Sequence, residues 1–122
     1  FLAGQSGDVR CCIVLARPST GRWHQIRRHL NGLSHPILGD STHGNSRTNR
    51  LWQQRQTAPL PGARLCLHLA RMEIPPTPVT LGEAIDARCP MPSDMLEMLV
   101  AHAPEVLANS REVLESETGL VF

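Results

Sequence analysis

The stretch that most constrains the fold is residues 21–30, GRWHQIRRHL. Read as a helix, its apolar side chains recur at helical spacing and form one stripe, while its polar side chains point the other way. The stripe is Trp23, Ile26, Leu30 and Leu33, and the polar side is His24, Arg28 and Asn31. Arg27 falls at the border, where a guanidinium stays half-buried only if a negative group or a carbonyl meets it. The sequence therefore predicts an amphipathic helix over residues 21–32, capped by Ser19 or Thr20, with an arginine that needs a partner.

Patterns on either side of this stretch predict an α+β fold with a mixed, mainly antiparallel sheet and flanking helices. Residues 9–16 are apolar and β-branched with little alternation, as in a strand covered on both faces at the centre of a sheet. Residues 72–74 and 79–86 are expected to be strands, the second at an edge. Ser93 is expected to cap a helix, and Pro104 to open the last one.

The connecting segments are expected to be loops with short helical pieces. We expect residues 1–8 to be a loop and residues 35–44 to be an ordered loop whose turns are fixed by Pro and Gly. Residues 45–63 resemble an exposed basic insert, with a helical turn or two around residues 49–56. Residues 64–71 combine the hydrophobic spacing of a helix with that of a strand, and they are expected to form a short helix or bend leading into the next strand. The apolar faces of the last two helices are expected to consist of Met95, Leu96, Leu99, Val100, Leu107, Val113 and Leu114.

At 122 residues the chain is at most one domain. We expect it to be incomplete, because it begins without an initiator Met and ends on Leu120, Val121 and Phe122. No run approaches the roughly 18 apolar residues of a membrane helix, and no charged-then-apolar leader is recognised, so a cytoplasmic location is expected. The four cysteines form neither a CxxC pair nor the pattern of a disulfide scaffold, and we expect reduced thiols.

The net charge of +1 conceals a strong asymmetry along the chain. Residues 1–71 hold ten Arg against Asp8 and Asp40, whereas residues 72–122 hold two Arg against nine acids. The first part is expected to bind a polyanion, and the second to be a solvated acidic flank. All twelve cations are Arg, which favours bidentate contacts with phosphate or carboxylate, although a GC-rich genome gives the same bias.

Few catalytic patterns are present. The sequence contains no GxSxG, P-loop or paired-carboxylate arrangement. His24 and His29 are five residues apart and point in different directions on a helix, and no HExxH pattern exists, so no metal site is expected. Asp40 is either a turn cap or a partner for an arginine, and the cap is favoured. Arg22 lies at the expected helix N-terminus, where free amides could hold a phosphate, but an ordinary capped helix explains that feature equally well.

Three motifs carry a resemblance to a known family. Residues 21–30 (GRWHQIRRHL), residues 35–40 (HPILGD) and residues 67–68 (LH, before a strand) resemble the GRTHQIRVHL, HPIxGD and LH signatures of RluA-type pseudouridine synthases. Their order and spacing match over residues 9 to about 100. A ten-residue motif supported by two others is a specific signal.

The sequence departs from the common family pattern at two positions. Trp23 stands where most members have Thr, and Arg28 where most have an aliphatic residue. Together with residues 43–44 and 49–50, these departures are similar to the tRNA pseudouridine synthase C subgroup.

The resemblance implies an isomerase that converts uridine to pseudouridine in folded RNA without a cofactor or metal. In that family an aspartate of an HRLD-type motif attacks the flipped nucleotide, and a Tyr commonly stacks on the base; this sequence contains neither the motif nor any Tyr. Arg27 matches the family arginine that pairs with the attacking aspartate. The residues implied to lie near the RNA backbone or the rim of the site are Arg22, His24, Gln25 and Arg28, and Leu67 is implied to pack under the base pocket.

The first interpretation is therefore the C-terminal part of a pseudouridine synthase catalytic domain at residues 1–103, followed by a helical extension at residues 104–122. Such a chain is expected to be inactive alone, and the intact enzyme to be a monomer acting on tRNA, with ribosomal RNA as the main competitor. The second interpretation is an RNA-binding domain without catalysis. A histidine-based phosphodiesterase or nuclease is the weakest, because it needs two converging histidines.

Overall fold

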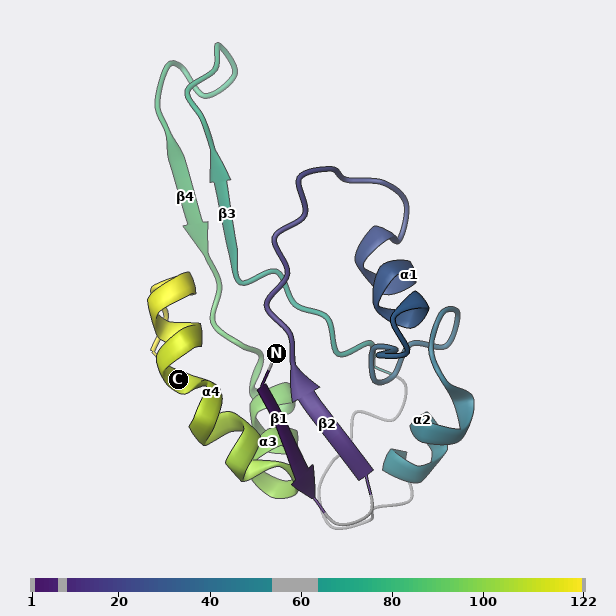
Figure 1. Cartoon of the computed structure of the whole chain (residues 1–122). Helices are drawn as coiled ribbons and strands as arrows, with labels where there is room; N and C mark the ends of the chain where they lie inside the picture. Colours follow the sequence, from purple (N-terminus) through teal and green to yellow (C-terminus); the bar gives the residue numbers. More distant parts are fainter. Residues whose placement is uncertain (1, 7–8, 54–63, 122) are drawn as a thin grey trace.

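Four helices and two β-hairpins form the part of the chain described by the computed structural model, which is residues 2–6, 9–53 and 64–121 (Figure 1). In chain order the elements are β1 (Leu2–Ser6), β2 (Val9–Ile13), α1 (Gln25–Gly32), α2 (Ser46–Gln53), β3 (Arg71–Ile74), β4 (Ile85–Arg88), α3 (Ser93–His102) and α4 (Pro104–Thr118). The predicted α+β class is confirmed.

The strands form two separate antiparallel pairs. β1 pairs with β2 in the register Leu2↔Ile13, and β3 pairs with β4 in the register Arg71↔Arg88. The prediction of a mixed sheet with residues 9–16 at its centre is wrong for the described residues, where β2 has β1 as its one neighbour. The predicted loop at residues 1–8 is also wrong, because β1 lies within it; its small, polar residues have weak strand preference, and the ladder with β2 outweighs that preference.

The core lies where α3 and α4 pack together, with α4 against the β1–β2 hairpin (Figure 1). Its buried members are Trp52, Met98, Leu99, Ala103, Val106 and Leu107. Trp52 comes from α2, in the segment predicted to be exposed, and only 3% of its surface is accessible. Burying so large an apolar ring stabilises the fold more than any solvated placement, so the exposed insert is a wrong prediction at this residue. Residues 54–63 of the predicted insert lie outside the described residues.

α1 begins at Gln25, four residues later than predicted, because the chain turns at His24. His24 is the N-cap residue and has a left-handed backbone with φ 48°. The predicted hydroxyl cap is absent; instead the Gln25 side chain accepts hydrogen bonds from the Thr20 hydroxyl at 2.6 Å and the Arg22 amide at 3.1 Å. Trp23 therefore lies outside the helix, and it is exposed, as is Leu33, so half of the predicted apolar stripe does not face the core.

α4 begins at Pro104 as predicted, and α3 begins one residue earlier than predicted, but the buried faces of both helices differ in detail. Pro92, not Ser93, is the N-cap of α3, and no side chain caps it. Met98 is buried where Val100 was expected, because Met98 packs in the core cluster with Trp52 of α2 and Leu107 of α4. Val113 of α4 is also exposed rather than packed.

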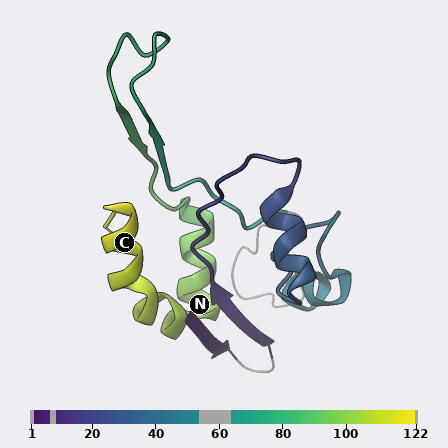
Figure 2. The same ribbon diagram turned by 45° about the horizontal axis from the view of Figure 1, so that its top comes forward.

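The β3–β4 hairpin projects away from the helices (Figure 2). β3 lies at the predicted strand, whereas β4 begins only at Ile85. Residues 78–82 form turns because Thr77 and Thr80 bond to each other: the Thr77 amide donates to the Thr80 hydroxyl at 2.9 Å, and that hydroxyl donates to the Thr77 carbonyl at 3.0 Å. Residues 64–70 bend into β3 without a helix.

Within residues 2–6, 9–53 and 64–121, none of the helices combines the length and apolar character needed to cross a bilayer. Cys11, Cys12, Cys66 and Cys89 all lie in the described residues, and none of them forms a disulfide. Burial raises the pKa of the Cys66 thiol above its ordinary value.

Candidate functional site

Arg27 and Asp40 form a bidentate ion pair between α1 and the loop of residues 35–44. Arg27 Nε donates to Asp40 Oδ2 at 2.8 Å and Arg27 Nη2 donates to Asp40 Oδ1 at 2.7 Å. The Asp40 side chain is fully buried and that of Arg27 is 16% exposed. The negative partner that the border position of Arg27 required is therefore Asp40 of the same chain.

Asp40 also caps the turn that follows it. Its Oδ1 accepts hydrogen bonds from the Thr42 amide at 3.0 Å and the His43 amide at 2.9 Å. Cap and arginine partner, treated as alternatives from the sequence, are both correct. The Arg27 guanidinium, followed by these two amides, holds the pKa of the Asp40 carboxyl far below its usual range in spite of burial. Asp40 is thus ionised and has its oxygens occupied.

His24 and His43 extend this pair into a polar chain. Arg27 Nη1 lies 3.0 Å from His24 Nε2, and His24 Nδ1 lies 3.0 Å from His43 Nε2. A guanidinium can only donate, so His24 Nε2 must accept, and its proton must sit on Nδ1 and be donated to His43. Desolvation, then the charge of Arg27, lowers the pKa of His24, which agrees with a neutral ring.

Trp23, which is exposed, stacks on His24. The two ring centroids are 3.9 Å apart with an interplanar angle of 20°, and His43 meets the indole edge-on at 5.7 Å and 80°. The left-handed backbone of His24, which costs about 1–3 kcal/mol in a non-glycine residue, produces this arrangement. The hydrogen bonds to both ring nitrogens of His24 hold it there.

The loop of residues 35–44 is fastened on its other side to α2 and to the strand-like segment before β3. Asn49 Oδ1 accepts from the Gly39 amide at 3.0 Å, and Asn49 Nδ2 donates to the Asp40 carbonyl at 3.1 Å. The Cys66 amide donates to the Leu38 carbonyl at 2.9 Å. Gly39 has φ +77°, and a Cβ there would lie 1.8 Å from the Arg64 carbonyl oxygen. Only glycine fits this close approach.

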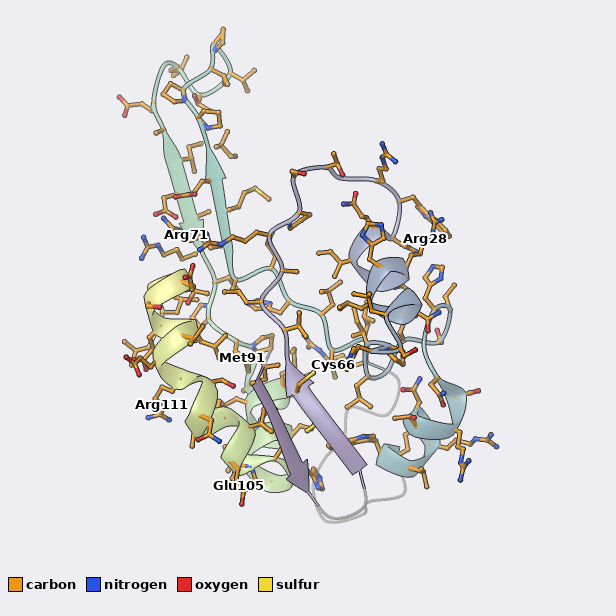
Figure 3. All side chains as sticks on the ribbon, in the orientation of Figure 1. Arg28, Cys66, Arg71, Met91, Glu105 and Arg111 are labelled. Atoms are coloured by element: carbon orange, nitrogen blue, oxygen red, sulfur yellow. The ribbon has the colours of Figure 1, made fainter. Side chains whose placement is uncertain are left out.

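The predicted RNA-contacting residues separate into two groups. Arg22 and Arg28 are exposed at the start of α1, and neither forms an ion pair with the described residues. Figure 3 shows Arg28 on α1. His24 and Gln25 are half-buried, and each has internal partners. Leu67 is 38% exposed in the segment before β3. The structure thus brings Arg22, His24, Gln25 and Arg28 to one end of α1 around Arg27.

Two residues of this site were not found from the sequence. His43 and Asn49 fall within the short stretches that resembled the subgroup, and that was the one signal available for them. His29 and His35 are not part of the polar chain. Across the described ranges there is no cluster of three His, Cys, Asp or Glu side chains that could hold a metal ion.

Comparison with known proteins supplies the family. No family model matches the chain. The tRNA pseudouridine synthase C of Yersinia pestis is 43% identical over 82 residues, which is 67% of this chain and 30% of that relative. The proteins of the same name from Salmonella typhi (44% over 71 residues, 58% and 26%) and Vibrio cholerae serotype O1 (42% over 69 residues, 57% and 27%) match similarly.

The chain belongs to the pseudouridine synthases, in the RluA-type family whose motifs form the site around Arg27. Within that family its similarity is to tRNA pseudouridine synthase C. The chain spans less than a third of the length of these curated relatives.

Proposed function

We propose that this chain is one part of an RNA pseudouridine synthase that isomerises uridine to pseudouridine in tRNA, and that it supplies the arginine side of the active site. The observation that supports this proposal best is the Arg27–Asp40 ion pair. It joins the GRWHQIRRHL segment of residues 21–30 to the HPILGD segment of residues 35–40, at the N-terminal half of α1.

Asp40 is not the nucleophile in this proposal. Its carboxylate is buried and accepts four hydrogen bonds, two from Arg27 and two from backbone amides, so it cannot reach a nucleotide. Asp40 is a positioning residue that fixes the plane of the guanidinium. The attacking aspartate would come from sequence outside this chain, and Arg27 would keep it ionised and oriented, as a nearby cation does for a carboxylate.

The rest of the site would serve the RNA. Arg22 and Arg28 are the exposed cations beside Arg27, and they suit contacts to phosphates flanking the modified uridine. His24 and Gln25 would position that end of α1, and Leu67 would pack under the base. No step of this reaction requires a metal or cofactor. Ribosomal RNA is the competing substrate.

The proposal extends to the domain organisation, the assembly and the location of the intact enzyme. Residues 1–103 would be the C-terminal part of a catalytic domain with the pseudouridine synthase fold, and residues 104–122 a helical extension on the same core. The intact enzyme would be a cytoplasmic monomer.

Tritium release from unmodified tRNA labelled at uracil C5 tests the proposal. The full-length protein containing this chain is expected to release tritium, and the 122-residue chain alone is not, since a positioned arginine cannot replace the nucleophile. Release by the chain alone would contradict the assignment of the nucleophile. A full-length protein that binds tRNA without releasing tritium would favour the second candidate, a non-catalytic RNA-binding module, which rests on the exposed arginines alone.

The phosphodiesterase interpretation loses support from the geometry. His24 and His43 do converge, but both nitrogens of His24 are engaged, one by Arg27 and one by His43. A ring in that state has no free nitrogen for proton transfer to a substrate.

A further inference from the structure

Trp23 is the most conspicuous residue at the site without a role in the proposed chemistry. It is 67% exposed, whereas the other tryptophan, Trp52, is 3% exposed in the core. An indole of this size would contribute stability if it were buried. Its exposure beside the cationic end of α1 therefore calls for an explanation in terms of a ligand.

The ring is held in a fixed position. One face stacks on His24 with centroids 3.9 Å apart, and the edge of the indole system is met by His43. His24 is in turn held by Arg27 and His43 through 3.0 Å contacts, and Arg27 by the buried Asp40. The backbone of His24 has a positive φ in this arrangement, which is costly for a residue other than glycine. The arrangement pre-organises a flat aromatic surface, which lowers the entropy cost of binding a flat ligand.

The surroundings indicate the chemistry of that ligand. Arg22 precedes Trp23 in the chain and Arg28, labelled in Figure 3, lies on the first turn of α1. Both arginines are exposed. Stacking surfaces flanked by guanidinium groups are suited to an unpaired nucleobase whose neighbouring phosphates reach the cations. A protein side chain would use the ring but would leave two adjacent arginines without anionic partners.

We propose that Trp23, supported by His24, is a stacking platform for an unpaired nucleobase of the RNA substrate. This inference rests on the proposed function. The base that stacks there is a neighbour of the modified uridine and not the uridine itself, because the indole stacks on His24, and it is His24 that contacts Arg27. Trp23 is a substrate-binding residue, and His24 is a positioning residue for it.

The test is a cycle of protein and RNA variants. The probes are a short RNA duplex with one bulged adenosine and the same duplex with an abasic residue in the bulge. Trp23→Ala is expected to weaken binding of the adenosine duplex by roughly 5- to 150-fold, the range for losing one base–aromatic stack. The abasic duplex should bind the unaltered chain more weakly by a similar factor, and Trp23→Ala should add little to that loss. Equal losses for both duplexes, or no loss, would overturn the proposal.

Fluorescence gives a second readout. In the Trp52→Phe variant Trp23 is the one remaining tryptophan of the sequence, so its quenching by unmodified tRNA reports stacking directly. His24→Asn keeps a residue that tolerates positive φ but removes the supporting ring, and it should weaken the quenching and the preference for the bulged adenosine. Trp52→Phe itself should leave RNA affinity unchanged.

The outcomes separate this inference from the proposed function. Failure of the full-length protein containing this chain to bind any RNA contradicts both. Binding of tRNA with an unchanged Trp23 signal overturns the platform alone, leaves the enzyme assignment intact and would assign the exposed ring to a protein contact.

Discussion

At the scale of single residues, the site depends on one arginine, Arg27, each of whose three nitrogens has a partner within the chain. Two Arg27 nitrogens face Asp40, and the third faces His24. A half-buried guanidinium at the edge of a helix is stable only with such partners. The sequence showed that a partner was needed, and the structure identifies it as Asp40, thirteen residues away.

Asp40→Asn should destabilise the chain strongly. It leaves Arg27 in place without a counter-charge, and breaking a buried ion pair on one side costs about 3–5 kcal/mol. Urea unfolding at neutral pH measures the loss. Asp94→Asn is the matched control, since it breaks the Arg64–Asp94 pair, whose side chains are 34% and 39% exposed, and should cost about 1 kcal/mol or less. Equal losses in the two variants would contradict the special role of Asp40.

Arg27→Met in the full-length protein should lower turnover far more than RNA affinity, because its charge serves the catalytic aspartate and not the RNA. Arg27→Lys should rescue only in part, since an ammonium lacks the planar fork. Arg28→Ala should act mainly on affinity. Single-turnover rates and Kd values for tRNA test these expectations. Circular dichroism shows whether each variant is folded. An unchanged turnover rate for Arg27→Met would refute the assignment.

His24 should make the chain less stable in mild acid. Its pKa is lowered from the ordinary 6.5 by desolvation, by Arg27 and by His43, against the opposing charge of Asp40, and Arg28 lowers it slightly further. The unfolded chain therefore binds more protons below pH 6.5, so the contribution is present above that pH and is lost as pH falls through the folded pKa. The Asp40 contribution, with a lowered carboxyl pKa, is lost only in much stronger acid.

Urea midpoints between neutral pH and mild acid measure this effect. The unaltered chain should lose more stability over that window than His24→Asn, which cannot titrate there. If the two chains gave parallel profiles, His24 would not be the group responsible.

At the scale of elements, the loop of residues 35–44 is the piece that unites the site. It is fastened to α1 by Asp40, to α2 by Asn49 and to the segment before β3 by Cys66. Its Pro and Gly residues predicted an ordered loop, and that prediction is confirmed. What it is fastened to was not predictable, because hydrogen bonds between segments far apart in sequence leave no periodic pattern.

Gly39→Ala should loosen this loop. Alanine is strained at a positive φ, and its Cβ would also clash with the Arg64 carbonyl. The loss of unfolding free energy should therefore exceed that of Gly82→Ala by about 1–3 kcal/mol. Gly82 is the matched control because its φ is +79° and no atom lies within 4 Å of its added Cβ. Thermal unfolding measures the stability of both variants: Gly39→Ala combines backbone strain with the clash, whereas Gly82→Ala has backbone strain alone. A Gly39→Ala loss no larger than the control would show that the loop is not held closely.

At the scale of the whole molecule, the charge asymmetry has two uses. Several acids of the second part are not merely solvated, as was expected, but pair with arginines: Glu117 with Arg17, Asp94 with Arg64 and Asp86 with Arg71. Figure 3 shows Arg71 directed toward the end of α4, where Nη1 donates to the Glu117 carbonyl at 3.5 Å. These ion pairs neutralise three of the ten arginines of residues 1–71. The exposed arginines that remain in the described part of residues 17–53 are Arg22, Arg28, Arg47 and Arg50.

Binding of tRNA should therefore depend steeply on salt. If these four arginines each neutralise one phosphate, the logarithm of the binding constant should fall against the logarithm of salt concentration with a slope of about −3 to −4. Arg28→Ala should reduce the slope by about one. Arg111→Ala, an exposed arginine on α4, should leave it unchanged. Filter binding over a salt series measures the slope. A flat response would show that these arginines do not bind the phosphate backbone of the RNA.

The sequence by itself determined the α+β class, the positions of α3, α4 and β3, the family, and the need of Arg27 for a partner. These follow from local periodicity, from turn residues and from contiguous motifs, all of which are present in the linear order of residues. Only the tertiary structure decided that Asp40 is that partner, that α1 starts after a left-handed His24, that Trp23 faces outward while Trp52 joins the core, and that the hairpins do not merge into one sheet. Each of these depends on tertiary contacts, such as the one between Arg27 and Asp40 thirteen positions apart. The energies of these contacts exceed the local conformational preferences, and a short stretch of sequence does not show which residues will meet.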